Sequence, residues 1–213
     1  MEFKKVLLLS AHPDDAEIGA GGTIYFLASQ DAKIDHLVFS RCAKSLPKGI
    51  TEEKLLSECR RADKTLGINQ TTILDFPVRR FSEFRQDILE LLWQKRQENY
   101  DLMLCPWPHD THQDHRQLAE EAVRAWKRAL PTILFYEIPA NCLGFAPNFF
   151  FILSQKDVEV KLKALSHYKS QILRTPEFFS LENFKAVLTY NGMLVGEQFA
   201  EGFIMHSGTV RRT

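Results

Sequence analysis

A chain of 213 residues, 45% of them hydrophobic, is long enough to fold as one large α/β domain with a sizeable core. Lys plus Arg and Asp plus Glu each number 27, so the net charge is near zero, which argues against a surface that recruits nucleic acid. No apolar run approaches the roughly 20 residues of a membrane-spanning helix, so we expect no stable membrane insertion. The four cysteines form no CxxC pair and no signal-like segment is evident, so we expect reduced thiols and a cytoplasmic location.

The first predicted unit is a strand, a polar loop and a helix. The apolar run Val6–Leu9 is typical of a strand that is buried on both faces. One histidine and three acids follow it, and three glycines then lead into a helix predicted at Thr23–Ser29. In an open α/β sheet, ligands bind outside the carboxyl ends of the strands, so this polar loop is the expected place for a site.

The rest of the chain continues the alternation of strands and helices. Apolar or alternating runs predict further strands at Lys33–Ser40, Thr71–Leu74, Asp101–Cys105, Thr132–Tyr136 and Phe149–Leu153. Helical spacing of apolar residues predicts helices at Glu52–Leu66, Phe84–Glu98, His112–Leu130, Asp157–Ile172 and Leu181–Tyr190. The tail from Gly192 to Thr213 is weakly patterned, and no internal repeat or domain boundary is visible. This order predicts a three-layer α/β/α fold with a mostly parallel sheet, in a single domain over residues 1–213.

Two polar clusters follow predicted strands. The first is His12-Pro13-Asp14-Asp15, and the second runs from His109 to His115 with the sequence HDTHQDH. Because the carboxyl ends of parallel strands open on one edge of the sheet, we expect the two clusters to meet. Imidazoles and carboxylates are the ligands of a catalytic divalent metal, which takes three protein ligands and leaves one position open. One of the two adjacent aspartates can then bind the metal while the other faces the reacting water.

Each cluster also has a simpler interpretation. Thr111 and Asp114 fit a capping box, and Asp14 or Asp15 can cap the helix that follows. The glycines at Gly19–Gly22 resemble part of a dinucleotide fingerprint. Its third glycine, however, falls at Ile24, and acids that precede the glycines repel a pyrophosphate.

The two clusters resemble the motifs of a known family. The segment AHPDDAEIGAGGT at residues 11–23 resembles the first motif of the PIG-L/LmbE-like de-N-acetylases, and HQDH at residues 112–115 resembles the second. Weaker agreement extends to Leu66-Gly67, to KALSHYKSQ at residues 163–171 and to AEGF at residues 200–203. The resemblance implies a Rossmann-like, metal-dependent hydrolase that removes acetyl groups from N-acetylated amino sugars, often N-acetylglucosamine in a glycoconjugate.

The resemblance also implies a role for each motif residue. By motif position, His12, Asp15 and His115 resemble the ligands of Zn²⁺ or of another divalent metal such as Fe²⁺, and Asp14 resembles the general base. His112 resembles the histidine that stabilises the oxyanion in its protonated form, and Asp114 resembles the residue that orients it. One departure is Leu55, where the family often has an arginine.

Other residues near the predicted edge are candidates for binding a small N-acetyl sugar or glycoconjugate. They lie in loops after predicted strands and are Arg79, Arg80, His109, Asp110, Glu137 and Asn141. We interpret the histidines at 36, 167 and 206 as structural or surface residues without an acidic partner. The sequence leaves open a non-catalytic metal- or sugar-binding module, a hydrolase of another amide or ester bond, and the oligomeric state, homo-oligomers included.

Overall fold

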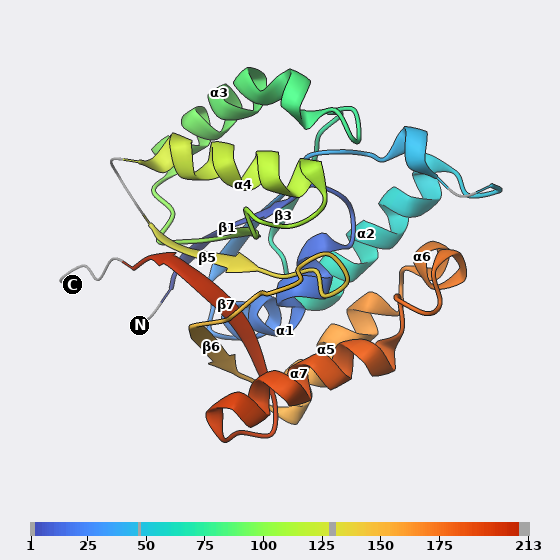
Figure 1. Ribbon diagram of the computed structural model, residues 1–213, viewed down its shortest axis with the longest axis vertical. Coiled ribbons are helices and arrows are strands. Elements are labelled where there is room, and N and C mark those ends of the chain that lie inside the picture. The colour runs from blue at the N-terminus through green and yellow to red at the C-terminus, as the bar shows by residue number, and fades with distance from the viewer. Residues whose placement is uncertain (1–2, 47, 128–130, 209–213) are drawn as a thin grey trace.

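The computed structural model describes residues 3–46, 48–127 and 131–208. One seven-stranded sheet, in the order β3-β2-β1-β4-β5-β7-β6, runs through it with helices on both faces (Figure 1). β1 to β5 are parallel, whereas β7 is antiparallel to both β5 and β6. The strands are β1 (Lys5–Ser10), β2 (Lys33–Val38), β3 (Gln70–Ile73), β4 (Leu102–Pro106), β5 (Thr132–Tyr136), β6 (Phe149–Ile152) and β7 (Ala200–Ser207). The predicted fold class, a single-domain α/β fold with a mostly parallel sheet, is confirmed.

The helices form two layers of unequal size. Their bounds are α1 (Asp15–Ser29), α2 (Glu52–Leu66), α3 (Arg85–Lys95), α4 (Gln113–Trp126), α5 (Gln155–Leu165), α6 (Lys169–Arg174) and α7 (Leu181–Val195). α3 and α4 cover one face of the sheet, and α1, α2, α5 and α7 lie on the other (Figure 1). None of the helices in the described part of the chain is long and apolar enough to cross a membrane.

The interior strand β1 contributes side chains to the hydrophobic cores on both faces of the sheet. Val6 and Leu8 point into the core beneath α1 and α2, while Leu7 and Leu9 point into the core beneath α3 and α4. All four side chains are fully buried, as the apolar run predicts. Because β1 pairs in parallel with both β2 and β4, the loops that follow these strands emerge at one edge.

Helix α1 begins eight positions earlier than its predicted start at Thr23, so the glycines lie inside the helix and not in a loop. The reason is close packing rather than a turn. A Cβ atom on Gly19 would lie 2.2 Å from Cδ2 of Tyr136, and one on Gly22 would lie 2.5 Å from Cδ1 of Leu153. The glycines therefore let the helix approach the sheet and α5, which offsets their low helix propensity.

The close approach at Gly19 predicts a large effect of Gly19→Ala on stability. The new methyl group would overlap the buried Tyr136 ring, and overpacking of this kind costs about 1–3 kcal/mol. Gly21→Ala is the matched control, because its Cβ would meet Cγ of Lys161 at 3.0 Å, a contact that a shift of a few tenths of an ångström relieves. We expect thermal unfolding to show a lower Tm for Gly19→Ala than for Gly21→Ala. Equal Tm values would contradict the packing explanation.

Two other predictions differ from the structure. The helix predicted at Asp157–Ile172 is two helices, α5 and α6, because the chain turns between them and buries Tyr168 in the core. β7 lies in the tail that predicted no element; its first four residues are buried, so it lacks the alternation of a half-exposed strand. The predicted end of the helix at Leu130 lies outside the described residues. The aromatic strand β6 packs against the core, with the Phe151 ring 5.7 Å from that of Phe203.

Candidate metal centre and catalytic site

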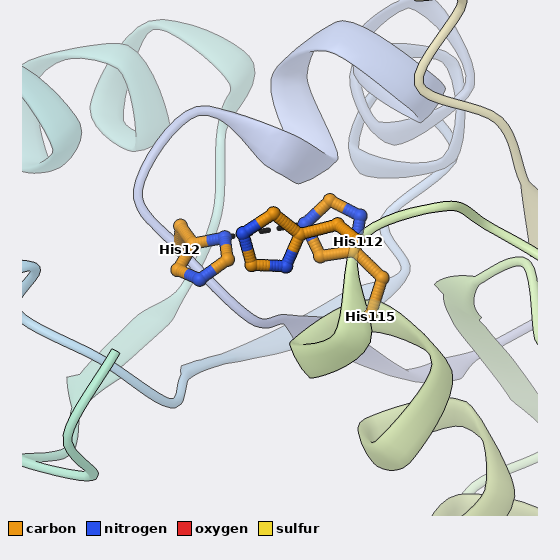
Figure 2. A group of neighbouring side chains, drawn as sticks. All are labelled: His12, His112 and His115. Carbon is orange, nitrogen blue, oxygen red and sulfur yellow. Dashed lines mark hydrogen bonds between the residues drawn. The ribbon is translucent and has the colours of Figure 1, made fainter. Parts of the chain in front are cut away.

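The two sequence clusters meet at the carboxyl edge of the sheet. His12 lies just after β1, and His115 comes from the first turn of α4 (Figure 2). Asp15 is the first residue of α1. Nδ1 of His12 lies 3.2 Å from Nε2 of His115, which is 3.3 Å from Oδ1 of Asp15. The remaining distance, from Nδ1 of His12 to Oδ2 of Asp15, is 3.5 Å. His112 contributes a further ring nitrogen within 4.8 Å of the other two histidines.

The side chains of His12, Asp15 and His115 fit the ligand set of a tetrahedral metal ion, with Asp15 offering either of its two carboxylate oxygens. Zinc bonds of about 2.0–2.1 Å in a tetrahedron place neighbouring ligand atoms about 3.3 Å apart. The distances among His12, Asp15 and His115 scatter around that value. The protonation of the two rings agrees with this. Nε2 of His12 and Nδ1 of His115 each donate to a carboxylate, so in the neutral rings Nδ1 of His12 and Nε2 of His115 carry no proton and can bind a metal. The residues present therefore form a candidate metal-binding group.

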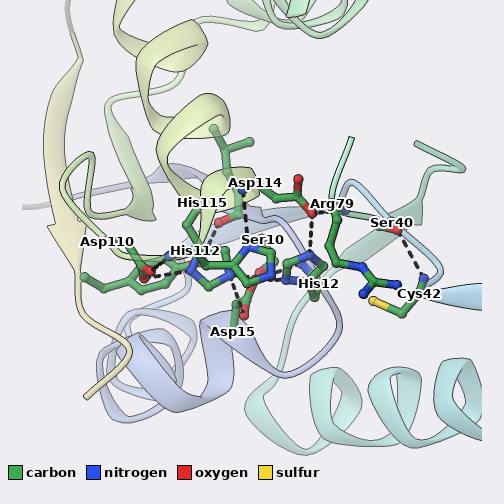
Figure 3. Close-up of polar contacts among 12 residues, drawn as sticks. Ser10, His12, Asp15, Ser40, Cys42, Arg79, Asp110, His112, Asp114 and His115 are labelled. Atoms are coloured by element: carbon green, nitrogen blue, oxygen red, sulfur yellow. Dashed lines mark hydrogen bonds and ion pairs between the residues drawn. The ribbon is translucent and has the colours of Figure 1, made fainter. Parts of the chain in front are cut away.

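The buried carboxylate of Asp110 orients the His115 ring. Nδ1 of His115 donates to Oδ2 of Asp110 at 2.7 Å, and the backbone N–H of His112 donates to Oδ1 at 2.6 Å (Figure 3). Asp110 is fully buried and therefore does not reach a substrate. From the sequence, Asp110 could lie at the mouth of the site as a candidate substrate contact or support a metal ligand. In the structure it lies behind His115 and fixes the tautomer that leaves Nε2 free for a metal.

Asp114 has a different partner from the one predicted. Its carboxylate accepts a hydrogen bond from Nε2 of His12 at 3.1 Å and from the backbone N–H groups of Arg79 and Phe81, at 2.5 and 3.3 Å. Asp114 bonds to His112 only through its backbone N–H, which donates to Nδ1 of the His112 ring at 3.2 Å. The predicted capping box is also wrong, because His112 is the N-cap residue of α4 and the Asp114 side chain bonds elsewhere. Asp114 thus orients His12, not His112.

The Asp14 side chain lines the site and does not cap the helix that it precedes. It occupies the N-cap position of α1 with φ 93°, and its side chain makes no capping hydrogen bond. Within the described residues its carboxyl has no hydrogen-bond partner, and it lines the cavity beside His12. Burial, followed by the neighbouring carboxylates of Asp15 and Glu17, raises the pKa of Asp14 well above its ordinary value. A carboxyl group that is poised in this way is suited to exchange a proton with a ligand.

The His112 ring lies against the ring of His115 at 4.7 Å between centroids and also lines the cavity. Burial, together with the neighbouring His12 and His115, lowers the pKa of His112 to about 4. Its Nδ1 accepts the backbone N–H of Asp114, so in the neutral ring the proton lies on Nε2. His112 can therefore donate one hydrogen bond through that nitrogen.

In each of the three candidate ligands, burial and the neighbouring charges shift the pKa in opposite directions. Burial opposes charge on His115, but Asp15 and Asp110 outweigh it and raise its pKa to about 10. Burial likewise opposes charge on His12, and Asp15 and Asp114 raise its pKa. Burial opposes ionisation of Asp15 as well, but the two histidines hold its pKa far below the usual range. The cluster is thus organised around a negative charge that attracts a cation.

A cavity of about 340 Å³ opens beside this cluster, a size that suits a small molecule. His12, Asp14 and His112 lie in its wall. Of the predicted substrate contacts, Arg79 and Asn141 line it. The remaining lining residues are Pro13, Cys42, Ser45, Leu46, Leu55, Val78, Gln171, Arg174, Thr175 and Phe178.

The other predicted substrate contacts lie elsewhere. Arg80 is exposed and forms an ion pair with Glu83. His109 is exposed and packs against the Trp107 ring at 5.3 Å. Glu137 lines a separate small cavity beside Gly19. The sequence did not predict the cavity-lining residues from α6 onward, which are Gln171, Arg174, Thr175 and Phe178. Of these, only Gln171 falls in a segment that resembles a family motif.

Comparison with known proteins agrees with this geometry. The family model described as PIG-L, GlcNAc-PI de-N-acetylase, matches residues 7–126, which include both clusters. The chain belongs to the PIG-L family. It is 32% identical over 173 residues to the uncharacterized deacetylase YaiS of Escherichia coli K12, covering 78% of this chain and 91% of that protein.

Two further PIG-L comparisons cover nearly the whole chain. The diacetylchitobiose deacetylase of Thermococcus kodakarensis is 29% identical over 224 residues, covering 94% of this chain and 82% of that protein. The crystal structure of the conserved protein TT1542 from Thermus thermophilus superposes with a TM-score of 0.82 at 26% identity, covering 97% of this chain and 96% of that one. The fold and the overall sequence similarity therefore extend over nearly the whole chain.

A buried polar network lies next to the loop that carries His12. Oγ of Ser10 lies 2.8 Å from Nε2 of His36, whose Nδ1 donates to Asp63 at 3.0 Å. The prediction that His36 lacks an acidic partner is therefore wrong, because α2 brings Asp63 beside β2. Glu17 accepts a hydrogen bond from the Tyr168 hydroxyl, and burial together with Asp63 raises the pKa of Glu17 to about 8. The network ties β1, β2 and α2 together directly before His12.

Proposed function

We propose that this protein is a metal-dependent hydrolase that removes the acetyl group from an N-acetylated amino sugar or its glycoconjugate. The observation that carries the proposal is the spacing of the donor atoms of His12, Asp15 and His115 at 3.2–3.5 Å, beside an unpartnered Asp14 in the wall of a cavity. The names of the relatives, a diacetylchitobiose deacetylase among them, support the acetamide as the bond that is cleaved.

The residues divide the chemistry between them. His12, Asp15 and His115 would hold a divalent cation, which when bound would supply Lewis acidity to the amide carbonyl and make a nearby water more acidic. Asp14 accepts the proton of the attacking water, a role that its free carboxyl group and its place in the wall support. The same carboxyl group then returns the proton to the departing amine nitrogen.

His112 stabilises the negative charge that develops on the amide oxygen. Its Nε2 carries the proton, because Nδ1 already accepts a backbone N–H. The sequence led us to expect a protonated ring, but a pKa lowered to about 4 favours the neutral form at pH 7. A neutral imidazole still donates the single hydrogen bond that an oxyanion requires.

The proposal predicts that free amine is released only while the metal is present. Purified protein is to be assayed with N-acetylglucosamine, its methyl glycoside, diacetylchitobiose and N-acetylglucosamine 1-phosphate. We expect a chelator to abolish amine release and added Zn²⁺ or Fe²⁺ to restore it. Binding without amine release would support a non-catalytic module, and cleavage of acetyl esters alone would support another hydrolase. Amine release that survives complete metal removal would contradict the mechanism.

A further inference from the structure

A second group of side chains that can ligate a metal lies in the core between α1 and α2. Among the described residues, Glu17, Cys59 and Asp63 bring one ligand atom each to within 4.8 Å of one another. Glu17 lies in α1, whereas Cys59 and Asp63 are four positions apart on α2 and therefore share one face of that helix. Their exposed fractions are 0%, 0% and 2%, so the group is closed to solvent.

Each carboxyl group in this cluster is held through one oxygen only. Oδ2 of Asp63 accepts a hydrogen bond from Nδ1 of His36 at 3.0 Å and another from the Thr71 hydroxyl at 2.7 Å. Oε1 of Glu17 accepts one from the Tyr168 hydroxyl. Carboxylates that ligate metal ions are oriented by donors of this kind, while their other oxygen binds the ion. The two carboxyl groups have this arrangement.

The second oxygen of each carboxyl group lacks a partner. Oε2 of Glu17 and Oδ1 of Asp63 are buried, and neither has a hydrogen-bond partner among the described residues. A buried acceptor without a partner is unfavourable, and two neighbouring carboxylates also repel each other. A cation between the two oxygens would satisfy both acceptors and remove the repulsion.

The thiol of Cys59 indicates which cation fits. Mg²⁺ and Ca²⁺ prefer ligand sets made of oxygen alone, whereas Zn²⁺ combines sulfur with carboxylate oxygen. A tetrahedral Zn²⁺ with bonds of about 2.0–2.3 Å holds such atoms about 3.4–3.6 Å apart, so side-chain adjustments of about 1 Å would complete the site. Binding would displace the proton of the thiol, which passes to solvent.

We propose that Glu17, Cys59 and Asp63 bind a structural Zn²⁺ ion that ties α1 to α2 and is separate from the metal of the catalytic centre. Oε2 of Glu17, Sγ of Cys59 and Oδ1 of Asp63 are its ligands, and one buried water completes the tetrahedron. Because the site is closed, the ion binds as the chain folds and does not exchange with the cavity. Glu17 follows Asp15 by two residues, so the ion also fixes the start of the helix that carries this candidate ligand.

Sulfur gives a signature that separates the two metal sites. The candidate catalytic ligands His12, Asp15 and His115 offer only nitrogen and oxygen, whereas Cys59 offers a thiolate. Protein produced in medium supplemented with Co²⁺ is to be analysed for total metal per chain and for near-ultraviolet absorption. We expect two ions per chain and a thiolate-to-cobalt charge-transfer band. One ion per chain, or two ions without the band, would overturn the inference, and a water or a shared proton would then occupy the gap.

Variants then assign the ions to their sites. Cys59→Ala is expected to lose one ion and the band, whereas His115→Ala is expected to lose one ion and keep the band. Cys105→Ala is the matched control, because it removes another fully buried thiol, from the core beneath α3 and α4. We expect this control to keep both ions and the band. A band that survives Cys59→Ala, or that Cys105→Ala also removes, would overturn the assignment.

A second variant covers the case in which Cys59→Ala does not fold. Glu17→Gln keeps the thiol and the size of the side chain but removes the charge, and it is expected to lose the band and one ion. A band of unchanged intensity in Glu17→Gln would contradict the proposed ligand set. These outcomes do not depend on the proposed reaction. Two ions with the band and no amine release would leave the core site standing, and amine release with a single ion would leave only the deacetylase proposal.

Discussion

Replacing Asp14 by asparagine is expected to lower kcat by about 10²- to 10⁴-fold while the metal content stays unchanged. Asparagine keeps the size of the side chain and tolerates the positive φ of 93° at this position, so the fold should be preserved. The carboxyl group makes no hydrogen bond to any other described residue, and its removal leaves no buried partner unsatisfied. The measurement is steady-state amine release together with metal analysis of the purified variant.

The adjacent Asp15 provides the matched control for this prediction. Its carboxylate lies 3.3 Å from Nε2 of His115 and accepts the backbone N–H of His12 at 2.7 Å. Asp15→Asn removes the negative charge from the candidate ligand set, so we expect both metal content and activity to fall. The two variants would then lose activity for different reasons, Asp14→Asn with its metal retained and Asp15→Asn with its metal lost. Full activity in metal-loaded Asp14→Asn, or loss of metal from Asp14→Asn alone, would contradict the division of roles.

The meeting of the two polar clusters could be predicted from the sequence, because each cluster follows the end of a strand. His12 and Asp15 follow β1, and Asp110 and His115 follow β4, its immediate neighbour in the sheet. Strand order was not needed for this prediction, because parallel strands expose their carboxyl ends on the same edge. Residues whose positions depend on such a general rule can be found from one sequence.

The parts that were missed depend on packing between distant segments. α1 was predicted eight residues short because glycines are typical of loops, whereas here Gly19 allows contact with Tyr136, and that partner is visible only in the fold. Arg174 follows a turn that divides a predicted single helix, so no local pattern places it in the cavity. The partner of Asp114 was mistaken for a similar reason, since the loop after β3 covers it from a distant part of the chain.

Asp110→Asn is expected to weaken metal binding about 10- to 100-fold, the usual effect of removing a carboxylate that holds a metal-binding histidine. Asp110 accepts two hydrogen bonds, from Nδ1 of His115 and from the backbone N–H of His112. Asparagine has only one acceptor oxygen, so whichever way its amide is turned, its NH₂ group faces one of these two donors. If it faces His115, the ring proton moves to Nε2, the atom that must be free to bind the metal.

Competition with a chromophoric chelator measures this loss, and activity at saturating metal should recover much of the wild-type value. Cys142→Ala is the matched control, because its Sγ lies 3.4 Å from the same Oδ2 atom and its removal leaves the carboxylate in place. We expect the control to change metal affinity by less than about 2-fold. Unchanged affinity in Asp110→Asn would mean that His115 does not bind through Nε2, which would remove one of the three proposed ligands. A similar loss in both variants would show that packing around Asp110, and not its charge, governs the site.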